Sequence, residues 1–234
     1  EIMPSLVGSE MCIRDRKIGD YAKMCGIVGY LGNRQATEVL VEGLSKLEYR
    51  GYDSAGVAIN IGEELSVRKF KGRLQVLADD LTKNPINGGL GIGHTRWATH
   101  GEPSDVNSHP HFNKEKTIAV VHNGIIENYL ELREELQKEG YVFLSQTDTE
   151  VVAHLVDKFY EGNLLEAVYK ATGKLRGAYA LGVVCKDNNN ELVAVRKDSP
   201  LIVGVGEDEN FIASDIPAIL KYTRDVIFLE NDEY

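Results

Sequence analysis

Residues 25–32 read CGIVGYLG, a short apolar run bounded by glycines. A run of this length and character predicts a buried strand. The segment that follows, Arg34 to Glu48, has apolar residues at helical spacing and predicts a helix. The fold is therefore expected to begin with a core strand at residue 25.

Further strands and helices follow without regular alternation. Helices are predicted at Gly72 to Leu81, Glu127 to Glu139, Thr149 to Phe159, and from an N-cap at Asn163 to Leu175. Strands are predicted at SAGVAINIG (54–62), ELSVRKF (64–70), GGLGIGHTR (88–96), TIAVVHNG (117–124), AYALGVVC (178–185), ELVAVRK (191–197), LIVGVG (201–206) and NFIAS (210–214). This order does not fit a Rossmann-like parallel sheet. We expect an α+β fold with two mainly antiparallel sheets and helices outside them.

Composition excludes several classes of function. Hydrophobic residues make up 43% of the 234 residues and charged residues 26%, as in an ordinary globular domain. The formal net charge of −10 gives no indication of a nucleic-acid partner. No apolar run reaches the length of a membrane span, so no membrane association is expected. Cysteines at positions 12, 25 and 185 are few and far apart, which favours a reducing cytoplasm over a disulfide framework.

Residues 1–23 differ from the rest of the sequence. They lack clear periodicity, and MPSLVGSEMCIRDR at 3–16 resembles a translated sequencing adapter. We expect a disordered tail that is either non-native or a propeptide. Residues 24–234 form the second predicted unit, and its end just after an apparent strand suggests that a partner domain is missing.

Cys25 follows Met24, and an initiator methionine is normally removed before a small residue. Removal would leave Cys25 with a free α-amine, whose pKa of about 8 lies close to that of a thiol, about 8.5. Such an amine can act as general base for its own thiol, directly or through a water. The alternative is an inert buried cysteine, the interpretation that we give to Cys185.

Five motifs occur in order beyond this cysteine: MCGIVG at 24–29, EYRGYDSAG at 48–56, HTRWATHGEPS at 94–104, HNGIIEN at 122–128 and TDTE at 147–150. Together they resemble the glutaminase domain of the glucosamine-6-phosphate synthase family, across essentially all of residues 24–234. Phosphoribosyl-pyrophosphate amidotransferases and asparagine synthetases share the N-terminal cysteine but differ at the second and third motifs. The resemblance implies a four-layer αββα sandwich of the N-terminal-nucleophile hydrolase type and no cofactor.

The resemblance assigns roles to individual residues. Cys25 is the nucleophile, and Asn123 with Gly124 forms the oxyanion hole. The amino-acid head of glutamine is bound by Arg96, Thr99, His100 and Asp148. From the local sequence alone, Asn123-Gly124 would equally indicate a hairpin turn, Asp148 a helix N-cap and Arg96 a surface ion pair.

The resemblance also implies that Trp97 gates an ammonia channel, and that Arg50 and Tyr52 help to couple two active sites. A core aromatic and ordinary turn chemistry are the alternatives for these residues. His109 is expected to support the active-site loop. The histidines at 94, 100, 109, 111 and 122 have no usual zinc-site spacing, so no metal is expected.

The expected activity is hydrolysis of L-glutamine to glutamate and ammonia. In the full-length family the ammonia converts fructose 6-phosphate to glucosamine 6-phosphate, through sugar-isomerase domains absent from this chain. We expect a monomeric fragment and a dimeric full-length protein. Two rival hypotheses are a silent glutamine-binding module, if Cys25 stays internal, and a self-processing amidase of the same fold acting on another amide.

Overall fold

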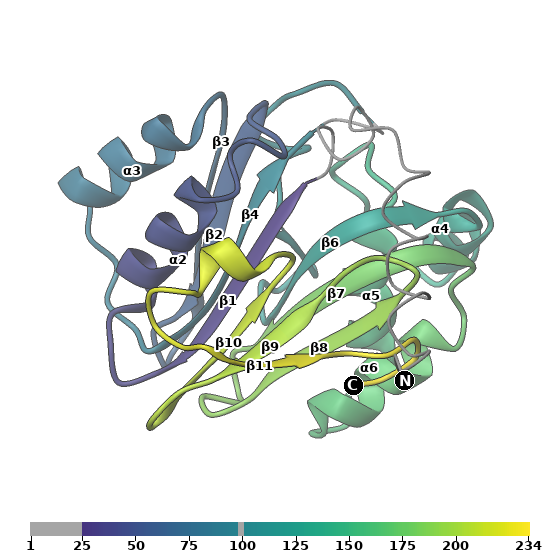
Figure 1. The fold of residues 1–234 in the computed structure, drawn as a ribbon. Coiled ribbons are helices and arrows are strands. Elements are labelled where there is room, and N and C mark those ends of the chain that lie inside the picture. The colour runs from purple at the N-terminus through teal and green to yellow at the C-terminus, as the bar shows by residue number, and fades with distance from the viewer. Residues whose placement is uncertain (1–24, 98–100) are drawn as a thin grey trace, which may run out of the picture.

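The computed structural model describes residues 25–97 and 101–234, which form two antiparallel sheets packed face to face (Figure 1). On the outer face of the larger sheet lie α2 (Ala36–Ser45) and α3 (Leu74–Lys83), at the left in Figure 1. The smaller sheet is covered by α4 (Tyr129–Lys138), α5 (Glu150–Phe159) and α6 (Leu164–Thr172). This four-layer αββα arrangement confirms the predicted fold class.

The larger sheet has the strand order β11-β9-β10-β1-β4-β2-β3. Its strands are β1 (Gly26–Gly32), β2 (Ser54–Asn60), β3 (Leu65–Lys71), β4 (Leu90–Arg96), β9 (Ile202–Val205), β10 (Glu209–Ala213) and β11 (Asp225–Phe228). The strand that opens the fold, β1, therefore lies in the middle of the sheet, between β10 and β4. Its register pairs Gly26 with Thr95, which puts the start of β1 beside the end of β4.

The smaller sheet has the order β5-β6-β7-β8. Its strands are β5 (His111–Phe112), β6 (Ile118–Ile126), β7 (Gly177–Cys185) and β8 (Leu192–Lys197). The two-residue strand β5 pairs with the start of β6, at Ala119 and Val120. In this sheet the far half of β6 is therefore paired only with β7.

Three apolar clusters fill the spaces between the four layers. Alternate residues of each strand face opposite sides, so β1 sends Val28 to the α2–α3 cluster and Ile27 to the cluster between the sheets. In β6, Val120 packs toward α5 and α6, and Val121 packs between the sheets. This alternation decides which polar side chains can meet between the sheets.

The five predicted helices are present; four are shorter than predicted, and α3 begins and ends two residues later than predicted. Asn163 caps α6 as predicted, because its side chain accepts a hydrogen bond from Glu166 N at 3.0 Å. The sequence did not predict β5 or the short 3-10 turn η2 (Ile216–Ala218). A two-residue strand and a single turn are too short to show a period.

No helix in the described part of the chain has the length and apolar character needed to cross a membrane.

Candidate active site

The site lies at one end of the space between the two sheets. Along β4 the inward-facing positions carry Ile92, then His94 and Arg96, so the apolar core gives way to polar groups at the end of the strand. Asn123 follows Val121 on the inward face of β6 in the same way. Cys25 directly precedes β1, beside the end of β4. Strand alternation and register therefore bring Cys25, His94, Arg96 and Asn123 together, although nearly a hundred residues separate the first from the last.

The Cys25 thiol is a free, half-buried group held by the backbone of Trp97. Trp97 N donates to Cys25 Sγ at 3.2 Å, and Sγ lies 3.5 Å from Trp97 O. Burial raises the pKa of Cys25 to about 11, against the smaller opposite effects of the Trp97 backbone and Arg96. The thiol is thus protonated at neutral pH and needs a base before it can attack.

Asn123 contacts the backbone of the nucleophile directly. Its Nδ2 donates to Cys25 O at 2.9 Å, and its Oδ1 lies 3.0 Å from Nε2 of His94. The same Nε2 lies 3.0 Å from His122 O, so both neighbours are acceptors and Nε2 must carry the proton. Burial lowers the pKa of His94 to about 3, so the ring is neutral. His94 therefore fixes the Asn123 amide with its NH2 group toward Cys25.

Gly124 lies inside β6, which continues to Ile126 in register with β7. The hairpin turn that Asn123-Gly124 could indicate is therefore absent, because pairing with β7 overrides the local turn preference. Gly124 has a φ of +129°, and a Cβ there would lie 2.0 Å from Ala178 O. Only glycine fits this position.

Arg96 and Asp148 are both buried near this end of the site. Arg96 ends β4, and its NH2 group donates to Gly101 O at 3.0 Å. Asp148 Oδ2 accepts from Ile126 N at 2.9 Å. The N-cap of α5 is Thr149, so the prediction that Asp148 could cap this helix is wrong, and the carboxylate is attached to β6 instead. Thr99 and His100 lie outside the described residues.

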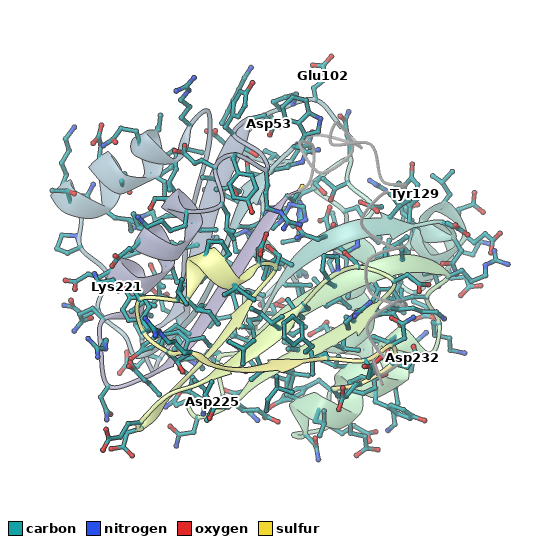
Figure 2. All side chains as sticks on the ribbon, viewed as in Figure 1. Asp53, Glu102, Tyr129, Lys221, Asp225 and Asp232 are labelled. Carbon is teal, nitrogen blue, oxygen red and sulfur yellow. The ribbon has the colours of Figure 1, made fainter. Side chains whose placement is uncertain are left out.

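Trp97 contacts Cys25 through its backbone, Arg50 acts on the thiol electrostatically, and Tyr52 lies against Trp97. The Tyr52 ring packs edge-on to Trp97, with centroids 5.7 Å apart. Asp53 N donates to Arg96 O at 3.0 Å, so the segment that contains Tyr52 is attached to the end of β4. Asp53 lies at the same end of the molecule as Glu102 (Figure 2). Arg50 is buried and bonds to Asp215 Oδ2 at 3.1 Å. Arg50 therefore contacts the C-terminal half of the chain.

A buried histidine cluster backs the site, and the sequence did not predict how it is connected. His109 Nε2 and His122 Nδ1 each lie 2.9 Å from the hydroxyl of Thr149. The rings of His94 and His109 pack with centroids 4.2 Å apart. His109 thus connects its own segment to the start of α5, next to Asp148. The periodicity of a single strand cannot reveal such contacts between segments.

Within residues 25–97 and 101–234, no group of three or more His, Cys, Asp or Glu side chains is placed to hold a metal ion.

Comparison with known proteins gives one family. The model of the glutamine amidotransferase domain family matches residues 94–221. The curated glutamine–fructose-6-phosphate aminotransferase (isomerizing) of Clostridium perfringens is 65% identical over 211 residues, which cover 90% of this chain and 35% of that protein. The chain therefore spans about a third of the length of the curated relatives that it matches.

Two solved structures share the fold. One is glutamine phosphoribosylpyrophosphate amidotransferase from B. subtilis in complex with ADP and GMP, with a TM-score of 0.73 and 27% identity. The other is described as the allosteric regulatory enzyme of purine biosynthesis, with a TM-score of 0.76 and 28% identity. Each match covers 89% of this chain and 45% of the other chain.

Proposed function

Because this chain belongs to the glutamine amidotransferase domain family, we propose that it hydrolyses L-glutamine to L-glutamate and ammonia, with Cys25 as the nucleophile. The observation that carries the proposal is the hydrogen bond from Asn123 Nδ2 to Cys25 O. It places a fixed amide donor next to Cys25, the residue that directly precedes the central strand β1. We assign this activity to residues 24–234.

The α-amine of Cys25 is the proposed base. Since burial raises the pKa of the thiol, the free thiolate is scarce at neutral pH and proton removal must accompany attack. An α-amine titrates near 8 and lies on the same residue. In the printed sequence this nitrogen is acylated by Met24, and an amide nitrogen cannot accept the proton. The proposed reaction therefore requires cleavage between Met24 and Cys25.

Attack of Cys25 Sγ on the side-chain amide of glutamine forms a C–S bond and a tetrahedral oxyanion. We assign the Asn123 amide and the Gly124 backbone N–H to this oxygen. The Asn123 amide has two N–H groups and uses one on Cys25 O, which supports a second bond to the oxyanion. Collapse of the intermediate expels ammonia, which takes its proton from the ammonium of Cys25. Water then hydrolyses the thioester to release glutamate.

The amino-acid head of glutamine needs a cation and an anion on either side of its α-carbon. We assign its α-carboxylate to Arg96 and its α-ammonium to Asp148, with Thr99 and His100 as further polar partners. Both residues are buried, which supports this pairing because water screens buried charges less.

Trp97 is the proposed gate for departing ammonia, and Tyr52 and Arg50 the proposed coupling residues. Their contacts support these roles: Trp97 holds Cys25 Sγ, Tyr52 packs on Trp97, and Arg50 binds Asp215.

We infer the use of the ammonia from the names of the relatives. In a protein of their length, it would convert fructose 6-phosphate to glucosamine 6-phosphate in domains that this chain does not contain. We further infer a cytoplasmic location, a monomeric glutaminase fragment and a dimeric full-length protein. Light scattering on the 234-residue chain tests the monomer, and a stable dimer would contradict it.

A second candidate function is glutamine binding without turnover. It is based on the Met24–Cys25 peptide bond. With this bond intact, Cys25 has no free α-amine to act as base, but the proposed binding groups Arg96 and Asp148 are unchanged. The first test is glutamate release by a chain that begins at Cys25, beside its Cys25→Ala variant and the 234-residue chain. Turnover only by the first protein supports the hydrolase. Glutamine binding by all three without turnover supports the binding module.

A further inference from the structure

Lys69 is a charged side chain on an inward-facing position. It lies in β3, the edge strand of the larger sheet (Figure 1). The two earlier residues on its face, Leu65 and Val67, pack into the cluster between the sheets. Strand alternation directs Lys69 the same way, toward the end of that space where Arg96 lies.

The Lys69 ammonium binds three carbonyl groups of one connecting segment. Nζ donates to Val106 O at 3.0 Å, Ser108 O at 2.9 Å and Pro110 O at 3.2 Å. An ammonium has three N–H donors, so all of its capacity is used on this segment. Burial lowers the pKa of Lys69 to about 8, with Glu150 and Asp105 acting in the opposite direction and Arg96 and Lys116 in the same one. The group is therefore still mainly protonated at pH 7.

The neighbouring strand is shaped to receive the same segment. Gly56 of β2 pairs directly with Lys69, and a Cβ on Gly56 would lie 2.2 Å from His109 O. The absence of a side chain there lets the segment lie against the sheet. Asp105 adds a third attachment, since its Oδ1 accepts from Lys71 N at 2.7 Å. We call residues 104–110 with these attachments the clamped segment.

The clamped segment is connected to both proposed binding groups. Just before it, Gly101 O accepts from Arg96 NH2, and Asn107 Nδ2 donates to Glu102 O at 2.9 Å. Near its other end, His109 bonds to Thr149, the residue after Asp148. A shift of this segment would therefore change the spacing between the Arg96 guanidinium and the Asp148 carboxylate.

We propose that Lys69 is a positioning residue for glutamine binding, whose ammonium holds the clamped segment on β3 and so fixes Arg96 and Asp148 at the spacing of the α-carboxylate and α-ammonium of glutamine. This inference rests on the proposed function. An inward lysine on an edge strand can also serve only to prevent strand–strand aggregation. That role needs a charge but not three carbonyl partners, so variants can separate the two.

The test uses the chain that begins at Cys25, at pH 7, with Lys69→Met, Lys69→Arg and Lys71→Met. Lys71 lies two residues further along the same strand, with an exposed side chain, and is the matched control. For Lys69→Met we expect the KM for glutamine to rise about tenfold with kcat within twofold, the pattern of lost ground-state binding. For Lys69→Arg we expect a KM within threefold of the parent, because the guanidinium keeps donors and Lys69 borders a cavity of about 360 Å³. The Lys71→Met variant should match the parent.

Amide hydrogen exchange on the 234-residue chain gives a readout that does not depend on turnover. Lys69→Met should lower protection of the Asn107 and Ser108 amides at least tenfold, and Lys71→Met should not. If the parent shows no glutaminase activity, the proposed function fails. Hydrogen exchange then still tests whether Lys69 holds the clamped segment on β3. Should Lys69→Met not fold, Lys69→Gln, which keeps two donors, should give a smaller rise in KM. Unchanged KM and unchanged exchange in a folded Lys69→Met or Lys69→Gln variant would overturn the proposal.

Discussion

At the scale of single residues, the candidate site depends on groups that neighbouring residues hold in position. The Cys25 thiol is held by the backbone of Trp97, and the Asn123 amide is held by the side chain of His94. His94 is buried and neutral, and no step of the proposed reaction uses it as acid or base. Its effect is to prevent the Asn123 amide from turning its oxygen toward Cys25.

This geometry predicts the behaviour of His94 variants in the chain that begins at Cys25. Phenylalanine keeps a buried ring but has no N–H, so His94→Phe should lower kcat about 10- to 100-fold, or about 1.4 to 2.7 kcal/mol of transition-state stabilisation. The KM should stay within twofold, because His94 does not touch the amino-acid head. Steady-state glutamate release measures both constants.

Glutamine provides the matched control for this prediction. His94→Gln retains an N–H donor at about the right reach and should recover part of the lost kcat. In the Asn123→Ala background, His94→Phe should have little further effect. Equal losses from His94→Phe with and without Asn123 would show that His94 acts on the site by another route.

At the scale of elements, the predicted strand ends lie within two residues of the observed ones and the predicted helix ends within three. The cap at Asn163 and the period of α5 are local properties, so the sequence contains them. The fate of Asn123-Gly124 is not local: the pair has strong turn preference, yet β7 keeps it in a strand. Asp148 likewise looked like a cap and instead accepts a hydrogen bond from β6. For ELSVRKF the sequence predicted a strand, but it did not predict the inward Lys69 or its three carbonyl partners.

The α6 cap gives a prediction at this scale. Asn163→Ala removes the acceptor of the Glu166 N–H and should lower the free energy of unfolding by about 1 kcal/mol. Asn163→Ser keeps a side-chain oxygen at the cap and should lower the free energy of unfolding by only a few tenths of a kcal/mol. Urea unfolding of the three proteins measures the difference, and equal losses in both variants would contradict the capping role.

At the scale of the whole molecule, the two sheets contribute different halves of the site. The larger sheet provides Cys25 and Arg96, and the smaller sheet provides Asn123 and Gly124. Motif recognition in the sequence named these residues, but only the packing of one sheet on the other shows how they meet. The buried histidine cluster also joins the two halves, since His94 of the larger sheet lies 3.0 Å from Asn123 Oδ1 of the smaller one.

Burial lowers the pKa values of His94, His109 and His111 well below the usual 6.5. As the pH falls below 6.5, the unfolded chain binds protons at these sites while the folded chain keeps the rings neutral. The contribution of these histidines to stability is therefore fully present above pH 6.5 and falls as pH decreases, by up to about 1.4 kcal/mol per pH unit for each histidine.

The corresponding experiment is urea unfolding from pH 7.5 to 4.5 for the parent and His109→Gln. The glutamine side chain cannot bind a proton. The free energy of unfolding of the variant should therefore fall less steeply with decreasing pH, by the slope that corresponds to about one proton fewer bound on unfolding. Carboxylate contributions are common to both proteins and cancel in the comparison. Parallel pH profiles would show that His109 is not buried and neutral in the folded protein.

The register of β1 has a consequence for how a mature enzyme could arise. Residues 28–31 of this strand are paired on both sides, with β4 and with β10, and Gly26 is paired with Thr95 of β4. The side chains of Ile27 and Val28 lie in two different packed cores. A chain trimmed one residue too early or too late cannot compensate by sliding, because a one-residue slip would turn Ile27 out of one core and force Val28 into the other. Under the proposed mechanism, only a cut at the Met24–Cys25 peptide bond leaves the α-amine on the nucleophile. We therefore expect a cut one residue away to abolish glutamate release, even where a folding assay shows no difference.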